Sequence, residues 1–506
     1  MSERFEFDFG VRDRADAKRR PRGAQMRMLV MGDFSGSGTR DLSDFSDIER
    51  RPLVRVDIDN FDAVLRRFSP CINVPDDTGE GIQVCVAALD DFHPDALFQS
   101  LPRFHALNEL RKRLLDPATF AGAAAQLWGA GEGEGTAVGA DEGRPDEREA
   151  SMFERLLGKP PQDRDAGGDA QRAVAGIDQF IAKVVSPYAV AATDRSQAQC
   201  IDVVDEAIGD VMRGVLHHPE FQAVEAAWRS LHGLVTRWEG DHVPALYVLD
   251  VSRRELAEYI AAAGSDLTRT PLYTRIVDDE VGALGGEPWS LIVGNYNFSA
   301  DAQDLQLLAA LGTMASQAGG SFLAAAHPAI VGCRSLVEAP DSREWAIEDA
   351  ECAARWGAFR QSHVAPWIGL ALPRVLLRLP YGKNSDPVDC FRFEELGSQH
   401  DHEAYLWGNP AFACALLIGQ AFQARGWAMA PDDCPELDDL PCPIYEQDGE
   451  MRSQACAEVF LTEHAAQAML DMGLMPLVSY RDRHAVRVMR FQSIAAPATA
   501  LAGPWR

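Results

Sequence analysis

The sequence predicts a mixed α/β fold in which sheets are flanked by helices. Short apolar runs alternate along the chain with longer segments in which apolar residues recur every three or four positions. Such alternation is typical of a sheet covered by helices. The chain has 506 residues, of which 46% are hydrophobic. At roughly 150 residues per domain, this is enough for two to four cores.

The clearest boundary is the stretch 129–150, in which Gly and acidic residues replace every large apolar residue except Val138. This stretch cannot bury enough apolar surface to order itself, which indicates a flexible linker. Residues 160–169 form a second weak point. The expected parts are an arm at 1–27, a domain at 28–128, the linker at 129–150, a further linker with a short helix at 151–199, a domain at 200–494 and a tail at 495–506.

The first domain should be a small α/β unit. Asn60 can cap a helix whose apolar residues include Phe61 and Leu65, and Phe104 to Leu114 shows the spacing of a terminal amphipathic helix. The expected strands are Met28–Met31, Leu53–Ile58 and Ile82–Leu89.

The second domain should contain a larger sheet. Two helical stripes follow one another, Ile201 to Val215 and Phe221 to Val235, and Pro219 suits the first turn of the second. Further helices are expected at Arg253–Ala263 and Ala302–Ala318. The expected strands are Ala245–Val251, Trp289–Val293 and Ser321–Ala326, followed by a hairpin of Leu474–Tyr480 and Ala485–Phe491.

The charge balance excludes some classes of partner. There are 48 basic and 76 acidic side chains, which gives a formal charge of -28. Most of such a surface repels nucleic acid and anionic membranes. The exception is the basic stretch Arg12 to Arg27, which either contacts an acidic neighbour or is a solvated tail.

Targeting segments and cysteine patterns point to the cytoplasm. No run reaches the roughly 18 apolar residues of a membrane helix, and Met26 to Met31 is too short for a signal peptide. The ten cysteines include no C-x-x-C pair, so the sequence indicates neither a disulfide framework nor a zinc site.

No catalytic or cofactor motif is found. GDFSGSG at Gly32–Gly38 could cradle a phosphate, but it lacks the Lys-Ser/Thr ending of a P-loop and equally suits a tight loop. His400-Asp401-His402-Glu403 lacks the H-E-x-x-H spacing of a zinc site. We therefore expect no catalytic residues, no cofactor and no metal.

A strand pattern occurs before any core strand. Phe5, Phe7 and Phe9 alternate with Glu6, Asp8 and Gly10, which is the period-2 pattern of a half-buried strand. It either pairs outside its own domain or forms an edge strand of that domain.

Several long segments resemble one protein family. LHHPEFQAVEAAWRSLHGLV at Leu216–Val235, followed in order by LYVLDVSRRELAEYI, LYTRIVDDEVGALGGEPWSLIVGNYNFS and YLWGNPAFACALLI, resembles the large sheath subunit of type VI secretion systems, TssC or VipB. MLVMGDFSG and VRVDIDNFDAVLRRFSP, ahead of the linker, resemble the small subunit, TssB or VipA. The chain thus resembles the two subunits fused head to tail, and the fusion would make their association obligatory.

The resemblance implies a structural protein of the cytoplasm and not an enzyme. Its fold would be that of the contractile tail sheath. Partners would be other sheath subunits, including a full-length large subunit, an Hcp-like inner tube, a baseplate and a ClpV-like unfoldase. The sheath would assemble around the tube and eject it by contraction. No nucleic acid and no membrane insertion are expected.

The resemblance also suggests two docking segments. Phe5, Phe7, Phe9 and Val11 match the arm that the small subunit donates to a neighbour's sheet. Met152, Phe153, Leu156 and Leu157 form a narrow apolar stripe in SMFERLLG, where the large subunit offers a helix to the unfoldase. Docking of this helix on its own domain is the alternative.

The resemblance departs from the family near the end of the chain. Large subunits of the family continue well beyond the FQSI segment at Phe491–Ile494, whereas this sequence ends at Arg506. An alternative function is therefore a non-polymerising paralogue that acts as cap, nucleator or baseplate adaptor. An enzyme or ligand-binding protein that reuses the fold is a further alternative.

Overall fold

The computed structural model describes residues 24–36, 48–75, 81–129, 196–238, 240, 242–283, 285–347, 349–397, 401–447 and 449–505. These residues form two compact units. Unit one comprises 1–93, 215–386 and 396–506, and unit two comprises 94–214 and 387–395, each less its undescribed residues. The predicted mixed α/β class is confirmed.

Unit one is organised around a nine-stranded sheet with the order β11-β15-β14-β8-β7-β6-β1-β5-β2. Every neighbouring pair from β5 across to β14 is parallel, and β2, β15 and β11 add antiparallel edges. The strands are β1 (Arg27–Gly32), β2 (Val54–Val56), β5 (Ala245–Asp250), β6 (Leu291–Phe298), β7 (Ser321–Ala326), β8 (Ile368–Leu372), β11 (Glu436–Leu437), β14 (Met475–Ser479) and β15 (Val486–Val488).

Strand β1 lies in the interior of this sheet. Its six residues, RMLVMG, are all buried. It pairs with β5 from Arg27↔Ala245 to Gly32↔Asp250, and on its other side with β6 from Met28↔Leu291 to Met31↔Gly294. A continuous apolar run suits a parallel strand that is covered on both faces. A strand from before residue 129 therefore joins two strands from after residue 196.

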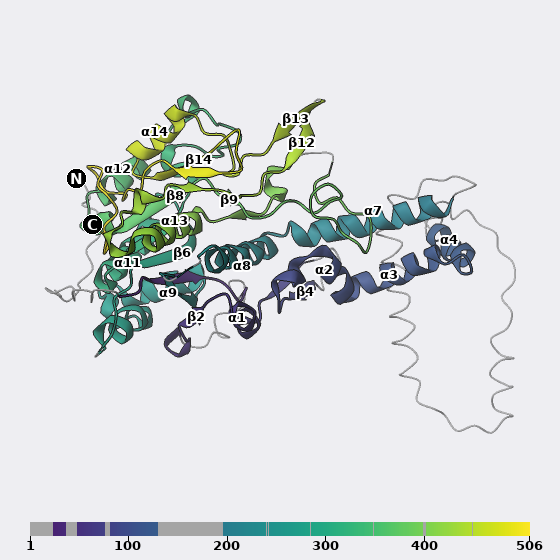
Figure 1. The fold of residues 1–506 in the computed structure, drawn as a ribbon, viewed down its shortest axis with the longest axis horizontal. Coiled ribbons are helices and arrows are strands. Elements are labelled where there is room, and N and C mark those ends of the chain that lie inside the picture. Colours follow the sequence, from purple (N-terminus) through teal and green to yellow (C-terminus); the bar gives the residue numbers. More distant parts are fainter. Residues whose placement is uncertain are drawn as a thin grey trace, which may run out of the picture. The chain divides into compact units, whose positions relative to one another are not determined.

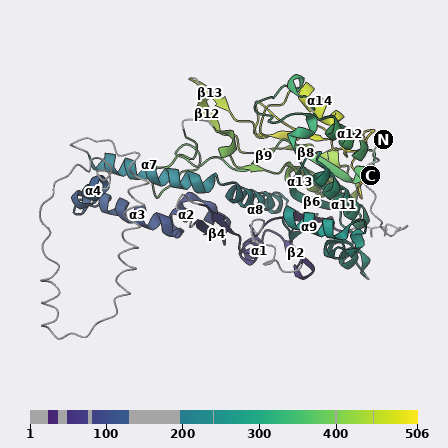
Figure 2. The same ribbon diagram turned by 180° about the vertical axis from the view of Figure 1, so that it is seen from behind.

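Helices cover both faces of the sheet (Figures 1 and 2). Alternate strand residues, such as Met31, Leu249 and Phe322, form one core with residues of α9, α11, α12 and α14. On the other face, α13 contacts β6, β7, β8 and α8. These helices are α8 (Pro219–Arg237), α9 (Arg253–Ala263), α11 (Ala302–Ala318), α12 (Ala350–Phe359), α13 (Pro410–Arg425) and α14 (Glu463–Asp471).

Local capping explains several helix starts. Ser252 and Glu255 form a capping box at α9, so this helix begins where the sequence predicts it. Pro219 occupies the first turn of α8, as predicted. Asn60 precedes α1 (Phe61–Phe68) but its side chain does not cap the helix. Instead, its Oδ1 accepts from the Asp57 N–H and its Nδ2 donates to the Arg55 carbonyl.

Short elements complete unit one. The small strand pairs are β3 (Cys71–Val74) with β4 (Ile82–Cys85), β9 (Val375–Leu376) with β10 (Trp407–Gly408), and β12 (Ile444–Gln447) with β13 (Glu450–Ser453). Cys71 and Cys85 are cross-strand neighbours and form a disulfide, which the cysteine spacing did not predict. The remaining short helices are η2 (Ile48–Arg50), η3 (Leu89–Phe92), η5 (Leu267–Arg269), α10 (Pro271–Tyr273), the π-helix η6 (Thr274–Gly282), η7 (Pro328–Val331), η8 (Ser342–Glu344), η9 (Ala365–Trp367), η10 (His402–Ala404), η11 (Gly426–Ala428) and η12 (Pro431–Asp433).

Unit two is helical. Its helices are α2 (Pro94–Ser100), α3 (Pro102–Leu115), α4 (Phe120–Gly129) and α7 (Gln197–Leu216). The last two residues of α7, Val215 and Leu216, belong to unit one. Asp205 of α7 is nearly inaccessible and accepts from Arg111 Nε of α3 at 2.6 Å and from the Arg392 N–H at 3.1 Å. One carboxylate thus ties three separate segments of this unit together.

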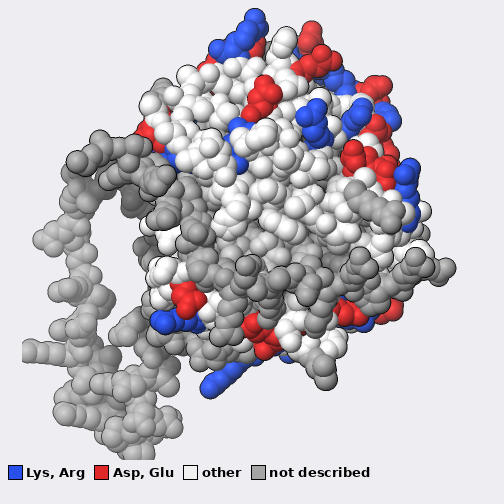
Figure 3. Space-filling model, turned by 90° about the vertical axis from the view of Figure 1, so that its left-hand side faces the viewer, with Lys and Arg blue, Asp and Glu red and all other residues white. Residues whose placement is uncertain are grey.

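The face drawn in Figure 3 does not carry a single charged field. There, basic and acidic side chains are interspersed among the described residues. Within the described part of the chain, no helix is both long enough and apolar enough to span a bilayer.

A buried ion-pair cluster joins α8 to the segment after β9. Glu225 is completely buried, and its Oε1 accepts from Arg378 Nε at 2.8 Å and from Arg229 Nε at 2.7 Å. Arg229 also donates to the Tyr381 hydroxyl at 3.0 Å. Burial alone would raise the pKa of Glu225, but the two arginines outweigh burial and lower it. The carboxylate is therefore ionised in the folded protein.

We predict that Glu225→Ala lowers the free energy of unfolding by about 3–5 kcal/mol, because Arg378 would stay buried without its carboxylate. Urea denaturation measures this loss. As a control, Glu258→Ala removes an exposed partner of Arg254 at 3.7 Å and should cost less than about 1 kcal/mol. Equal losses in the two variants would contradict the assignment.

Candidate functional site

The loop after β1 is held by an acid of the same chain. Gly32 is the last residue of β1, the loop continues to Gly36, and Asp250 ends the neighbouring strand β5. Asp250 Oδ1 accepts from the Phe34 N–H at 2.7 Å and from the Ser35 N–H at 3.2 Å. These two donors are the kind that a phosphate nest would use, and here a carboxylate takes them. The structure therefore favours the tight-loop interpretation of GDFSGSG over the phosphate site.

Asp250 lies in an acidic and poorly solvated environment. Burial and the nearby Asp33 raise its pKa to about 6, although hydrogen bonds from Ser35 and Phe34 and the charge of Arg51 act against the rise. Arg51 donates to the Asp250 carbonyl at 2.7 Å and pairs with Glu255. The loop, strand β5 and helix α9 are thereby linked through one polar network.

An aromatic cluster packs residues from before the linker around one tryptophan from after it. Trp228 of α8 is fully buried, and its ring centroid lies 5.3 Å from Phe34, 5.8 Å from Phe61 and 5.6 Å from Phe68. Its Nε1 donates to the Phe34 carbonyl at 2.9 Å. Edge-to-face contacts of this kind add to the stabilisation from burial alone.

Arg27 fixes the opposite end of β1. Its guanidinium donates to Glu280 at 2.7 Å and lies 4.1 Å from the Trp289 ring centroid and 5.0 Å from that of Tyr247. The Arg27 N–H also donates to Ser290 Oγ at 3.1 Å. A slip of β1 by one residue would break these contacts and those at Asp250 together.

A cavity of about 590 Å³ lies beside the carboxyl ends of β1, β5 and β6. In open parallel sheets, this is the usual place for a ligand. Its wall includes Asp33, Arg253, Arg254 and Tyr296. Both arginines pair within the protein, Arg253 with Asp304 and Arg254 with Glu258. The contacts of its charged groups thus do not indicate a particular ligand.

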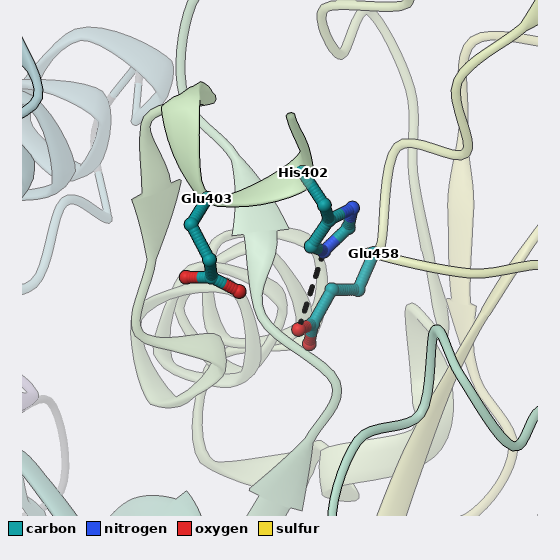
Figure 4. Close-up of side chains that lie close together, drawn as sticks. All are labelled: His402, Glu403 and Glu458. Atoms are coloured by element: carbon teal, nitrogen blue, oxygen red, sulfur yellow. Dashed lines mark ion pairs between the residues drawn. The ribbon is translucent and has the colours of Figure 1, made fainter. Parts of the chain in front are cut away.

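The described residues contain one group that could hold a metal ion, His402, Glu403 and Glu458 (Figure 4). His402 Nε2 lies 3.5 Å from Glu458 Oε1. Arg374 already binds both carboxylates, Glu403 at 2.8 Å and Glu458 at 2.5 Å. Burial would raise the pKa of Glu458, but His402 and Arg374 lower it to about 2. The guanidinium supplies the positive charge that a metal would supply, so this group is explained as an ion-pair cluster.

The predicted docking residues cannot be placed. The arm residues Phe5, Phe7, Phe9 and Val11 and the helix residues Met152, Phe153, Leu156 and Leu157 lie outside the described residues, as does His400. Neither Asp250 nor Glu225 belongs to a motif that the sequence reveals, and Arg27 stands out there only as the last residue of the basic stretch. Arg27 and Asp250 are polar residues at the ends of apolar runs, whereas Glu225 lies inside a helical stripe.

We predict that Asp250→Asn removes a pH dependence of stability. The pKa of Asp250 is about 6 in the folded protein, which is higher than in the unfolded chain. The protonated carboxyl therefore stabilises the wild type at low pH, and this stabilisation is lost as the pH rises through 6. Asn keeps an acceptor for Phe34 and Ser35 but does not ionise. Between pH 5.5 and 8, the free energy of unfolding of the wild type should therefore fall by about 1 kcal/mol relative to the variant. A difference that is constant with pH, in urea denaturation, would contradict this.

Comparison with known proteins gives two successive family matches, separated by residues 128–197. Residues 198–495 match the family VipB, described as EvpB/VC_A0108, tail sheath N-terminal domain. Residues 12–127 match the family described as type VI secretion system, VipA, VC_A0107 or Hcp2.

Two curated relatives come from Pseudomonas aeruginosa. The type VI secretion system sheath protein TssC1 is 30% identical over 310 residues, covering 60% of this chain and 62% of the relative. The sheath protein TssB1 is 32% identical over 99 residues, covering 18% of this chain and 56% of the relative. The chain thus spans about three fifths of the length of each relative. Since the VipB match covers more than half of the chain, the protein belongs to the EvpB/VC_A0108 (VipB) tail sheath family, with a VipA-type segment fused in front.

Proposed function

We propose that this protein is a structural component of a type VI secretion contractile sheath, in which the small and large subunits form one chain. The supporting observations are the two family matches and the names of both relatives, which are sheath proteins. A sheath subunit acts by assembly and movement and needs no catalytic group. We assign it to the cytoplasm and to a role without enzymatic activity.

The position of β1 carries this proposal. A VipA-type strand lies between two VipB-type strands and pairs with both. A sheath subunit must transmit force as a rigid body when the sheath contracts, and a shared sheet provides that rigidity. The linker at 129–150 keeps the two parts at high effective concentration and fixed stoichiometry. We propose the boundaries 28–128 and 200–494 for the two parts.

Assembly would proceed by strand donation between copies. The arm residues Phe5, Phe7, Phe9 and Val11 would add a strand to a neighbour's sheet, where backbone hydrogen bonds give affinity and alternate side chains give specificity. The resulting sheath would surround an Hcp-like tube, start at a baseplate and eject the tube on contraction. The SMFERLLG helix would then present Met152, Phe153, Leu156 and Leu157 to a ClpV-like unfoldase.

Electron microscopy of the purified chain, alone and mixed with a full-length large subunit, tests the sheath function. We expect regular tubes in at least one of these samples, and deletion of residues 1–11 should abolish them. The triple change of Phe5, Phe7 and Phe9 to Ser should act like the deletion. Its matched control, Glu6→Ser with Asp8→Ser, changes only the alternate positions and should preserve tubes. Absence of tubes in both wild-type samples would contradict the sheath function, and caps at tube ends would favour the non-polymerising alternative.

Binding to a ClpV-like unfoldase tests the docking helix separately. Changing Phe153, Leu156 and Leu157 to Asp should weaken binding by at least about tenfold, since each buried apolar side chain contributes about 1.5–3 kcal/mol. Calorimetry or fluorescence anisotropy measures the affinity. Arg155→Asp with Lys159→Asp is the control on the polar side and should have a smaller effect. Unchanged binding in the triple variant would contradict the assignment, and loss of folding would indicate docking on its own domain.

A further inference from the structure

The hairpin β12–β13 is a two-stranded sheet with an exposed outer edge. Its register pairs Ile444 with Ser453, Tyr445 with Arg452, and Glu446 with Met451. No described strand pairs with the other side of β13. Figures 1 and 2 show the hairpin apart from the nine-stranded sheet of unit one. An isolated two-stranded hairpin is only marginally stable in water, which favours a partner for this edge.

One hydrogen bond determines which backbone groups face that edge. The Gln454 N–H donates to the Pro443 carbonyl at 2.9 Å, directly before the hairpin register begins. In an antiparallel ladder, hydrogen-bonded and non-bonded pairs alternate. Arg452 and Tyr445 therefore form a hydrogen-bonded pair, whereas Met451 and Glu446 form a non-bonded pair. The N–H and C=O of Met451 consequently point away from β12, toward the outer edge.

The side chains around Met451 are exposed and carry opposite charges. Met451 is 70% exposed and Ile444, on the same face, is 64% exposed, the two highest values among the large apolar residues described. Glu450 and Arg452 lie on the other face, with their side chains 76% and 49% exposed. The sequence Glu-Met-Arg therefore has an apolar centre between an acid and a base.

This sequence is complementary to itself in antiparallel orientation. We propose that the outer edge of β13 pairs with the same edge of a second copy of this chain, with Met451 on the two-fold axis. Met451 then exchanges two backbone hydrogen bonds with Met451 of the second copy. Glu450 lies opposite Arg452 of the second copy, and Arg452 opposite its Glu450. Both charge pairs are favourable, and the two Met451 side chains lie next to each other on the opposite face of the four-stranded sheet, each with Glu446 of its own chain as its cross-strand neighbour.

The outer edge of β12 offers no such match. Its outward backbone groups belong to Ile444 and Glu446, since these residues form the non-bonded pairs of the hairpin. Self-pairing would place Glu446 opposite either itself or Ile444. The first arrangement is repulsive, and the second leaves a charge opposite an apolar side chain. The charges thus select β13 as the pairing edge.

This inference goes beyond the proposed function. A two-fold contact closes on itself, whereas a helical sheath is built from contacts that repeat in one direction. The β13 dimer is therefore a separate association of the chain, and it does not require the arm or a sheath lattice.

Charge reversal with sedimentation analysis of the full-length chain tests the dimer. Glu450→Arg alone places two like-charged pairs across the axis, and so does Arg452→Glu alone. Each should weaken dimerisation by about tenfold or more. The double variant restores both pairs in reversed orientation and should dimerise like the wild type. An equal mixture of the two single variants should form heterodimers, because every facing pair is then of opposite charge.

Arg67→Glu on α1 is the matched control, since it changes an exposed arginine by the same charge without touching the hairpin. It should leave dimerisation unchanged. Circular dichroism checks that each variant is folded, and negative-stain microscopy counts tubular polymers separately from dimers. A wild type that stays monomeric across the measurable range, or a mixture of the single variants that forms no heterodimer, would overturn the proposal.

Discussion

The hydrogen bonds that β1 makes on both of its sides are the constraint on which the rest of unit one depends. Strand β1 lies between β5 and β6 and pairs with both. If β1 were removed, the facing edges of β5 and β6 would each present a row of unpaired backbone groups to a buried interior. Buried backbone donors and acceptors that lack partners cost as much as lost hydrogen bonds. The VipB-type part therefore cannot complete its sheet alone, and the VipA-type part supplies the missing central strand. Their association is a matter of folding as much as of binding.

The polar groups at the two ends of β1 give this insertion a unique register. Apolar side chains such as Leu29 and Val30 would tolerate a two-residue shift, because the same faces would stay buried. The contacts of Arg27 and of the loop held by Asp250 would be broken by such a shift. Burying these charges is costly, and their contacts compensate only in one alignment. The buried charges thus contribute more to specificity than to net stability.

The sequence predicts individual elements better than their order. Helices α9 and α11 occur at the predicted residues, since capping signals and apolar periodicity are local. The apolar run of β1 is likewise visible, but nothing in it shows that its neighbours lie more than two hundred residues away. Strand order depends on pairing between distant segments, for which periodicity holds no information. The strand Ile368–Leu372 and the hairpin β12–β13 were not predicted either.

Polar sites were harder to predict for a related reason. Among 76 acidic residues, neither Asp250 nor Glu225 stands out until the fold buries it beside its partners. The Cys71–Cys85 pair becomes evident only from the register of β3 and β4. Conversely, His402 and Glu403 attract attention in the sequence, yet Arg374 from a distant segment gives them a structural explanation. Which charge neutralises which is decided by tertiary contacts.

Charge distribution connects these internal features to assembly. The chain is strongly acidic overall, yet the stretch Arg12 to Arg27 holds seven basic and two acidic side chains. Arg27 is the first residue of β1 and pairs with Glu280. The other basic residues belong to the segment between the predicted donor strand and β1. If this segment contacts another copy, its positive charge would be attracted to the acidic surface there, and attraction accelerates encounter more than it adds affinity. In the proposed strand donation, backbone pairing would then supply affinity and register, and adjacent parts of the same arm would carry the two properties.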